Sequence, residues 1–435
     1  MSIHTRQIDV DGLRIGMFVS KLDRPWVETP FLFQGFCIRS KSEIDELRQY
    51  CDFVEIDFEQ SEISVNDTQI IKLRGKPKLS RSESKRKRNF WRRFLQLLFG
   101  RRQREHADSP DAGNYYQDSV NVADELVVAR TLHSGVMQKL ISVLDDIRRG
   151  AIVRVPDLEI VVDGMVDSVL RNSTAMALLV RMQKTDDYTH AHSLSTAMWA
   201  LVFGRHLGLD RDSLKALGLG ALLLDVGKTK LPLELIRKRG PLTDVERMHM
   251  RNHVGLGLEV IRQAEAVDSR VLDMVATHHE RFDGSGYPNG LSGNQIPVFG
   301  RIGGIVDSYA AMSTDRPYAK AMSSYDAMRE FKALSDKSYQ AELVEQFIQA
   351  IGIFPAGTLV ELNTGEIAVV LKEHRASRLR PEVAIILDAN KRPLDDFSVV
   401  DLDTQSVDTS KTVNLWISRG VKPGEYDIKI DDYFL

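Results

Sequence analysis

Ionisable side chains interrupt the most apolar segments of this chain, and this feature restricts its fold more than any other. Asp225 ends the apolar run of "GALLLDVGK" (220–228), and Asp307 lies within "FGRIGGIVDSYAAM" (299–312). A buried carboxylate without a partner is costly because it loses its hydration. The nearest preceding basic residue to Asp307 is Arg301, which a helix would place on a different face. We therefore expect a metal ion to be the partner of Asp307.

Four histidines share this setting: His192, His253, His278 and His279 lie on expected helices or at their ends. Neighbours on a helix point about 100° apart, so the adjacent pair could bind two metals, or one could bind and the other support it. Imidazoles and carboxylates without thiolates suit Fe, Mn or Zn, and two such metals can activate water against a phosphodiester. Each histidine alone is better explained as an ordinary core or surface residue, but the whole set favours a metal centre.

Helical periodicity extends from about residue 116 to residue 350. The expected helices cover residues 123–147, 192–208, 213–225, 243–262, 270–280 and 299–312. Gly208 and Gly227 are stop signals for two of them, and Thr243 with Glu246 forms a capping box that starts a third. These features predict an all-α core that carries the metal ligands.

Smaller modules are expected on both sides of this core, so the chain is multidomain. Residues 1–75 combine a short helix with strands such as "VEIDF" and predict a small α/β module. After residue 352 the pattern alternates, first around a Thr-Gly turn in 357–374 and then in 381–388, which predicts a β-rich appendage. The predicted units are an N-terminal module at 1–75, a basic linker at 76–115, a helical domain at 116–352 and a β-rich domain at 353–435.

The linker contains the segment "KRKRNFWRRFLQLLFGRRQR" (85–104), in which nine residues are Lys or Arg. Its aromatic and leucine side chains follow helical spacing, but its apolar part is too short and too charged to span a bilayer. Two interpretations remain open: contact with an anionic membrane surface, or a solvated linker whose helix packs on its own protein.

Composition excludes several other classes of protein. A net charge of −3 and a pI near 6.4 argue against a general nucleic-acid binder. Two cysteines, Cys37 and Cys51, cannot form a disulfide framework and fit a reducing compartment. The N-terminus lacks the apolar region of a signal peptide, and no run of about 18 uncharged apolar residues is present. We expect a cytoplasmic protein, with peripheral contact at the inner membrane if residues 85–104 bind lipid.

Five ordered motifs between about residues 150 and 350 resemble the signature of the HD-GYP family. They are "YTHAHS" (188–193), "LLLDVGKTKLP" (222–232), "GPLTDVERMHMRNHVGLGLEVI" (240–261), "HHERFDGSGYPNG" (278–290) and "IPVFGRIGGIVDSYAAMSTDRPY" (296–318). Residues 1–75 also resemble a domain of unknown function that often precedes HD-GYP domains. The resemblance implies an HD-type helical core with two or three metal ions, usually iron or manganese. It implies hydrolysis of cyclic di-GMP to pGpG or GMP, and diguanylate cyclase (GGDEF) proteins as partners through the GYP loop.

The resemblance also implies roles for individual residues. The metal ligands would be His192, Asp225, His253, His278, His279 and Asp307, with Asp225 bridging two ions. Asp225 and Lys228 would be catalytic, the lysine near the scissile phosphate. The substrate contacts would be Asp186, Lys228, Gly286, Tyr287, Arg316 and Lys320, with Pro288 completing the GYP loop. Plainer roles remain open, because Lys228 could cap a helix, the loop glycines could serve only the turn, and Arg316 could pair with Asp315.

The sequence departs from the family pattern at three positions. Leu224 stands where the family has the histidine of its His-Asp pair, and leucine cannot bind a metal. Tyr188 replaces the Glu of three-metal members, so at most two metals are expected. Ala319 replaces a basic residue that contacts the nucleotide, although Lys320 is adjacent. As substitutes for the missing histidine, His190 would lie on the wrong helical face, and His249 is better explained as a surface residue.

These observations leave three hypotheses. The first is a cyclic di-GMP phosphodiesterase with a weakened dinuclear site, which the retained ligands favour. The second is a degenerate receptor or scaffold that binds the nucleotide without turnover, which Leu224 and Ala319 favour. The third, less favoured, is another phosphohydrolase reaction such as release of phosphate from a nucleotide monophosphate.

Overall fold

The structure is a computed structural model. It describes residues 5–23, 36–38, 41–57, 61, 116–182, 188–238, 240–264, 266–314, 320–374, 377–404, 415–426 and 428. The basic segment 85–104 lies outside the described residues, as do Asp186, Arg316, Ala319 and the side chain of Tyr188.

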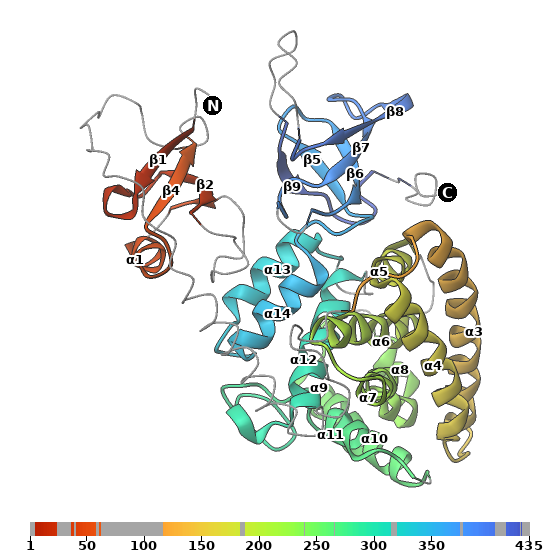
Figure 1. Ribbon diagram of the computed structural model, residues 1–435. Coiled ribbons are helices and arrows are strands. Elements are labelled where there is room, and N and C mark those ends of the chain that lie inside the picture. The colour runs from red at the N-terminus through yellow and green to blue at the C-terminus, as the bar shows by residue number, and fades with distance from the viewer. Residues whose placement is uncertain are drawn as a thin grey trace, which may run out of the picture.

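The middle of the chain is a helical domain built around α6 (Figure 1). Its helices are α3 (Val122–Arg148), α4 (Val155–Arg171), α5 (Ser173–Met182), α6 (Tyr188–His206), α7 (Arg211–Leu223), α8 (Leu233–Ile236), α9 (Asp244–Arg251), α10 (His253–Arg262), α11 (Ser269–Thr277), α12 (Val298–Ser313), α13 (Ser324–Ala333) and α14 (Ala341–Ile351), with the 3-10 turns η4 (Val226–Lys230) and η5 (Gly293–Gln295). The aromatic rings of Trp199 and Phe203 on α6 meet those of Tyr309 on α12 and Phe347 on α14 edge-on. The predicted all-α core is confirmed.

One predicted helix is wrong in its extent, because residues 243–262 form two helices rather than one. The capping box of Thr243 and Glu246 is present and starts α9. At the end of α9, the N–H of Asn252 bonds to the carbonyls of His249 and Met250, and α10 begins at His253. None of the residues of α9 is buried, whereas α10 packs against η4 and buries His253. The break separates an exposed helix from one that enters the core.

The N-terminal residues form a separate small α/β module, as the sequence predicts. Its antiparallel sheet has the order β1-β4-β2-β3 and consists of β1 (Thr5–Asp9), β2 (Phe18–Leu22), β3 (Phe36–Cys37) and β4 (Phe53–Asp57), with α1 (Lys41–Tyr50) beside it. Val19, Leu47 and Ile56 are fully buried in a hydrophobic cluster to which no described residue of the helical domain belongs. The module therefore has a core of its own.

The C-terminal residues form a five-stranded antiparallel sheet of order β8-β7-β6-β5-β9. Its strands are β5 (Leu359–Leu362), β6 (Ile367–Lys372), β7 (Glu382–Leu387), β8 (Pro393–Asp401) and β9 (Ile417–Gly420). Alternate residues point to opposite faces. Val360 and Val370 join the core of the helical domain, while Ile367 and Val369 join a second, smaller cluster. The predicted β-rich appendage is present, and one face of its sheet shares a core with the helices.

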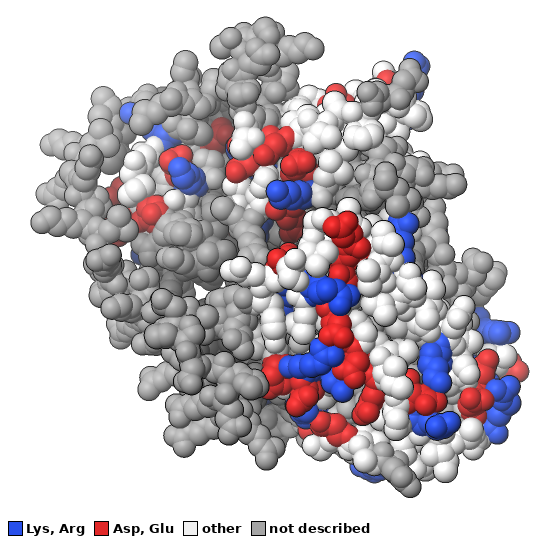
Figure 2. All heavy atoms as spheres, turned by 45° about the vertical axis from the view of Figure 1, so that its right-hand side comes forward, with Lys and Arg blue, Asp and Glu red and all other residues white. Residues whose placement is uncertain are grey.

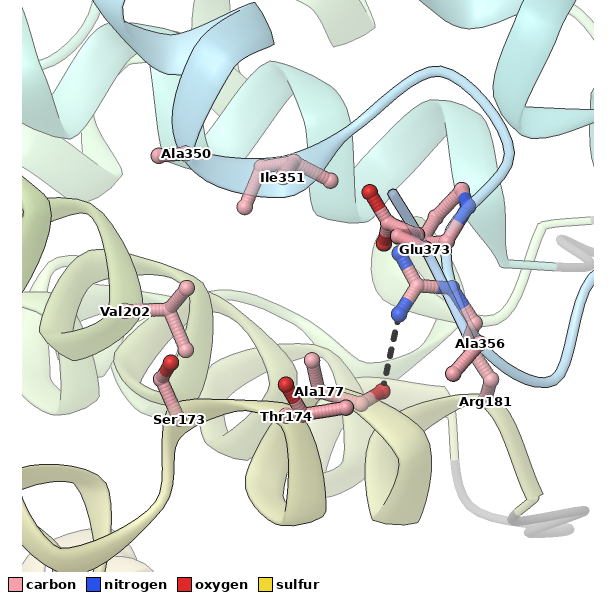
Figure 3. A pocket seen from close by; sticks show the side chains of 10 residues that line it. Ser173, Thr174, Ala177, Arg181, Val202, Ala350, Ile351, Ala356 and Glu373 are labelled. Carbon is pink, nitrogen blue, oxygen red and sulfur yellow. Dashed lines mark hydrogen bonds between the residues drawn. The ribbon is translucent and has the colours of Figure 1, made fainter. Parts of the chain in front are cut away.

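A small cavity of about 40 Å³ lies where the sheet meets the helices (Figure 3). Its lining includes Ser173 and Arg181 of α5, Ile351 of α14 and Glu373, which follows β6. Burial raises the pKa of Glu373 to about 7, against the opposing charges of Arg181 and Arg378. The guanidinium of Arg181 donates to the carbonyl of Ala177 and lies over the ring of Trp199. The cavity thus places an ionisable group at the contact between two domains.

The charged surface is mixed in sign. On the face in Figure 2, Lys and Arg side chains lie among Asp and Glu side chains over the described residues. Ion pairs such as those of Arg211 and Lys215 with Asp163 show the same mixing at residue level. Among the described residues, no helix has the length and apolar character needed to cross a bilayer.

Candidate metal centre

Four helices and one turn bring the six predicted ligands together. His192 lies on α6, Asp307 on α12, and His253 is the first residue of α10. Asp225 follows α7 and caps η4, while His278 caps the end of α11 and is followed by His279. Five of the six side chains are buried and His279 is half-buried. Residues from distant parts of the sequence therefore converge in the interior, as the metal hypothesis requires.

The first donor group consists of Asp225, His253, His278 and His279, whose ligand atoms lie within 4.8 Å of one another. The Nε2 atom of His253 is 3.3 Å from Oδ1 of Asp225 and 3.4 Å from Nε2 of His278. The rings of the adjacent pair, His278 and His279, have centroids 4.1 Å apart. Both side chains therefore face the first donor group. In a continuous helix they would point about 100° apart, but α11 ends at Thr277, just before the pair.

The tautomers of two of these histidines show that the group fits a cation. Nδ1 of His253 is 2.7 Å from the carbonyl oxygen of Met250, and Nδ1 of His278 is 3.0 Å from that of Val275. A carbonyl oxygen only accepts hydrogen bonds, so each Nδ1 carries the proton and donates it. In the neutral rings the two Nε2 atoms then carry lone pairs, and these atoms lie 3.4 Å apart. A metal ion would satisfy both lone pairs together with the buried Oδ1 of Asp225, which accepts no hydrogen bond in the described structure.

Protonation equilibria agree with this assignment. Burial lowers the pKa of His253 to about 4, although the charge of Asp225 opposes the shift. Burial also lowers the pKa of His278 and that of His279. The three imidazoles are therefore neutral at neutral pH, which is the form that binds metals.

The second donor group consists of His192, Asp225 and Asp307, so Asp225 belongs to both groups. Nε2 of His192 is 2.9 Å from Oδ1 of Asp307 and 3.8 Å from Oδ2 of Asp225. Nζ of Lys228 donates to the same Oδ2 at 2.5 Å. Burial alone would raise the pKa of Asp225, but the charge of Lys228, joined by that of His253 once its imidazole is protonated in acid, outweighs burial and holds that pKa well below its usual range. Asp225 is thus ionised and placed between the two groups.

The second group has three donors where the first has four, and the neighbouring Leu224 supplies none. The side chain of Leu224 is fully buried and belongs to the hydrophobic core of the helical domain. His190 is buried but joins neither donor group among the described residues, and His249 is exposed. The two substitutes considered from sequence therefore do not fill the gap.

The GYP loop folds back onto the centre. The ring of Tyr287 stacks on that of His279 at a centroid distance of 4.6 Å. The backbone N–H of Tyr287 also donates a hydrogen bond to the backbone carbonyl of His279. A side chain at Gly286 would collide with the backbone of Glu280 and Arg281, so only glycine permits this approach. Of the other predicted substrate contacts, Lys320 is described and is exposed.

Glu280 is a structural residue of this site to which the sequence pattern gave no role. It is buried, and its carboxylate accepts hydrogen bonds from the N–H groups of Asn289 and Leu291, at 2.7 and 3.0 Å. These hydrogen bonds hold the end of the GYP loop beside Glu280, the residue that directly follows His279. The sequence hinted at a role for Glu280 only by its position directly after two predicted ligands. Its hydrogen bonds to the GYP loop could not be predicted, because only the folded chain brings that loop back to Glu280.

Three known domain families match the chain, and one of these matches extends from the N-terminal module into the helical domain. The HD domain family matches residues 170–343, a domain of unknown function (DUF3391) matches residues 5–157, and a KOW domain associated with HD domains matches residues 359–428. The chain is 30% identical over 398 residues to the Pseudomonas aeruginosa protein named cyclic di-GMP phosphodiesterase PA4108, covering 91% of this chain and 89% of that one. The chain belongs to the HD-GYP family. The resemblance inferred from the five motifs is confirmed.

Two further relatives of this HD-GYP protein match shorter stretches of the chain. A cyclic di-GMP phosphodiesterase of Thermotoga maritima is 33% identical over 165 residues, which are 38% of this chain and 45% of that protein. A 3'3'-cGAMP-specific phosphodiesterase of Vibrio cholerae is 32% identical over 162 residues, which are 37% of this chain and 31% of that protein. The names of these relatives share one reaction, phosphodiester hydrolysis, and differ in the cyclic dinucleotide.

Proposed function

We propose that this HD-GYP protein is a metal-dependent phosphodiesterase that hydrolyses cyclic di-GMP to pGpG, GMP or both. The observation that carries the proposal is the pair of unprotonated Nε2 atoms beside Asp225 in a buried centre. The relative that matches nearly the whole chain is named for this activity, which favours cyclic di-GMP over cGAMP as the substrate.

The residues of the two donor groups would hold two divalent ions, with Fe or Mn as the proposed metals. His253, His278 and His279 would bind one ion, His192 and Asp307 the other, and Asp225 would bridge them. Divalent ions bound there would supply Lewis-acid chemistry to the phosphodiester and lower the pKa of water. The ammonium group of Lys228 reaches Asp225 and would also favour an anionic phosphate at the centre.

The loss of a ligand at Leu224 is expected to weaken one ion more than the other. The first group keeps three imidazoles beside Asp225, whereas the second keeps one imidazole and one carboxylate. One ion would therefore be bound tightly and the second only weakly, and we expect slow turnover as a result. The competing function is a receptor that binds cyclic di-GMP without cleaving it, which the same deficit favours.

Other parts of the proposal rest on sequence alone. Asp186, Arg316 and Lys320 are proposed to contact the nucleotide, and the GYP loop is proposed to contact GGDEF proteins. Residues 85–104 are proposed to bind an anionic membrane surface at the cytoplasmic side, because nine of them are basic and their aromatic side chains follow helical spacing.

The test is turnover of cyclic di-GMP by the metal-free protein before and after addition of Mn²⁺ or Fe²⁺, with cGAMP as a second substrate. We expect slow, metal-dependent formation of pGpG or GMP, faster than cleavage of cGAMP. Tight binding of cyclic di-GMP with no product under any metal would overturn the enzymatic proposal in favour of the receptor.

A further inference from the structure

A chain of stacked side chains leads from the metal centre to one basic residue that neither the family resemblance nor the relatives assign. The ring of Tyr287 is stacked 4.6 Å from that of His279, a candidate ligand. The guanidinium carbon of Arg251 lies 4.7 Å from the centroid of the same tyrosine ring. The cation is therefore held two ring contacts away from the centre, at the GYP loop.

Arg251 differs from the basic side chains around it in what its charge contacts. Arg247, one turn earlier on α9, is paired with Asp244, and Lys228 is paired with Asp225. Arg281 donates to the carbonyls of His278 and Glu280. In the described structure, no carboxylate or carbonyl accepts a hydrogen bond from Arg251, whose side chain is exposed. All five of its N–H donors are thus available to a ligand.

The backbone of Arg251 is fixed by the centre itself. It follows Met250, whose carbonyl accepts the Nδ1 proton of His253, and precedes the Asn252 that ends α9. Stacking on Tyr287 restricts the side chain at the other end. A guanidinium that is restricted in this way loses little entropy when it binds, which favours an anionic group with two oxygens.

We propose that Arg251 binds the phosphodiester of the cyclic dinucleotide that is not being cleaved. This inference rests on the proposed function and deepens it. A cyclic dinucleotide carries two phosphodiesters in one ring, so when one lies at the metal centre the other is a second anion close by. Arg251, beside the GYP loop and without an anionic partner, supplies the matching charge.

The experiment measures the dissociation constant and the turnover of cyclic di-GMP for the Mn²⁺-loaded wild type and for Arg251→Ala, Arg251→Lys and Arg251→Gln. Arg247→Ala is the matched control, because it removes a basic residue of the same helix that already has a partner. We expect Arg251→Ala to weaken binding by roughly 10- to 100-fold, the usual loss for a hydrogen bond to a charged group. The lysine variant should recover part of the affinity because it keeps the charge, and the neutral glutamine variant should not.

A second substrate distinguishes binding of the second phosphodiester by Arg251 from mere support of the Tyr287 ring. Bis(p-nitrophenyl) phosphate contains one phosphodiester and no second anion, so the loss of kcat/KM in Arg251→Ala should be about tenfold greater for cyclic di-GMP. Equal losses on both substrates would mean that Arg251 only supports Tyr287, and would overturn the inference. Wild-type affinity in Arg251→Ala or Arg251→Gln would overturn it as well.

The outcomes also separate this inference from the proposed function. If the wild type binds cyclic di-GMP without turnover, the enzymatic proposal fails and the dissociation constants alone decide the role of Arg251. If the wild type hydrolyses cyclic di-GMP and the Arg251 variants match it, the inference fails and the proposed function stands. If the wild type neither binds nor cleaves the nucleotide, both are overturned.

Discussion

At the scale of single residues, we propose that Leu224 limits the centre most. Its aliphatic side chain is packed in the core directly before Asp225, the carboxylate shared by both donor groups. The remaining donors were predictable from sequence, because imidazoles and carboxylates in apolar segments need a partner. Arg251 and Glu280 were not, because their partners are a ring and backbone N–H groups that only the folded loop places beside them.

Leu224→His is predicted to add a ligand to the second donor group. We expect bound metal to rise towards two equivalents and turnover to rise at least about tenfold, while the buried imidazole costs roughly 1–3 kcal/mol of stability without metal. Elemental analysis and turnover measure the gain. Leu223→His is the control, since it places the same group in the same apolar core and should lose stability without gaining metal. An unchanged metal content in Leu224→His would show that Leu224 does not limit the site.

At the scale of elements, the centre depends on how closely η4 approaches α10. A side chain at Gly227 would collide with the carbonyl oxygen of His253 and the N–H of Gly257. The turn that carries Asp225 and Lys228 is thus pressed against the helix that begins with His253. The sequence indicated the helices and the capping box at Thr243, but it predicted one helix where α9 and α10 are two. That break depends on burial of α10 against η4, which periodicity does not encode.

Gly227→Ala is predicted to lower the free energy of unfolding by roughly 1–3 kcal/mol and to weaken metal binding, because the turn must move away from α10. Gly255→Ala is the matched control on α10, where an added methyl group would meet no atom within 4 Å. That variant should be neutral or stabilising by about 0.5–1 kcal/mol. Chemical denaturation of both, with and without Mn²⁺, makes the comparison. Equal stability of the two variants would contradict the close approach.

At the scale of the whole molecule, the described residues of the three parts differ in whether they share a hydrophobic core with the helices. The N-terminal module has its own hydrophobic cluster, whereas one face of the C-terminal sheet completes the core of the helical domain. The β pattern after residue 352 predicted the strands, but not that half of their buried residues would pack on helices. Glu373 lies at this junction, beside the cavity that Arg181 also lines.

Glu373 makes the junction sensitive to pH. Its pKa is about 7 in the folded protein because of burial, above the ordinary 4.5 that the unfolded chain would show. Between these values the unfolded state releases a proton that the folded state keeps, so the free energy of unfolding should fall by roughly 1–3 kcal/mol as pH rises from about 4.5 to about 7. Glu373→Gln should remove that part of the decline, and Glu366→Gln, at the exposed turn with Thr364, should not. Parallel pH profiles for wild type and Glu373→Gln would refute the assignment.

The most direct test of the metal centre is the metal content of the full chain equilibrated with Mn²⁺, compared between wild type and Asp225→Asn. Asparagine keeps the size of the side chain but removes the charge shared by both donor groups. The control Asp273→Asn neutralises an exposed carboxylate of α11, outside both groups. We predict at least one equivalent in the wild type and in Asp273→Asn, and a loss of most of it in Asp225→Asn. A wild type without bound metal, or an Asp225→Asn variant that binds as much as the wild type, would contradict the account.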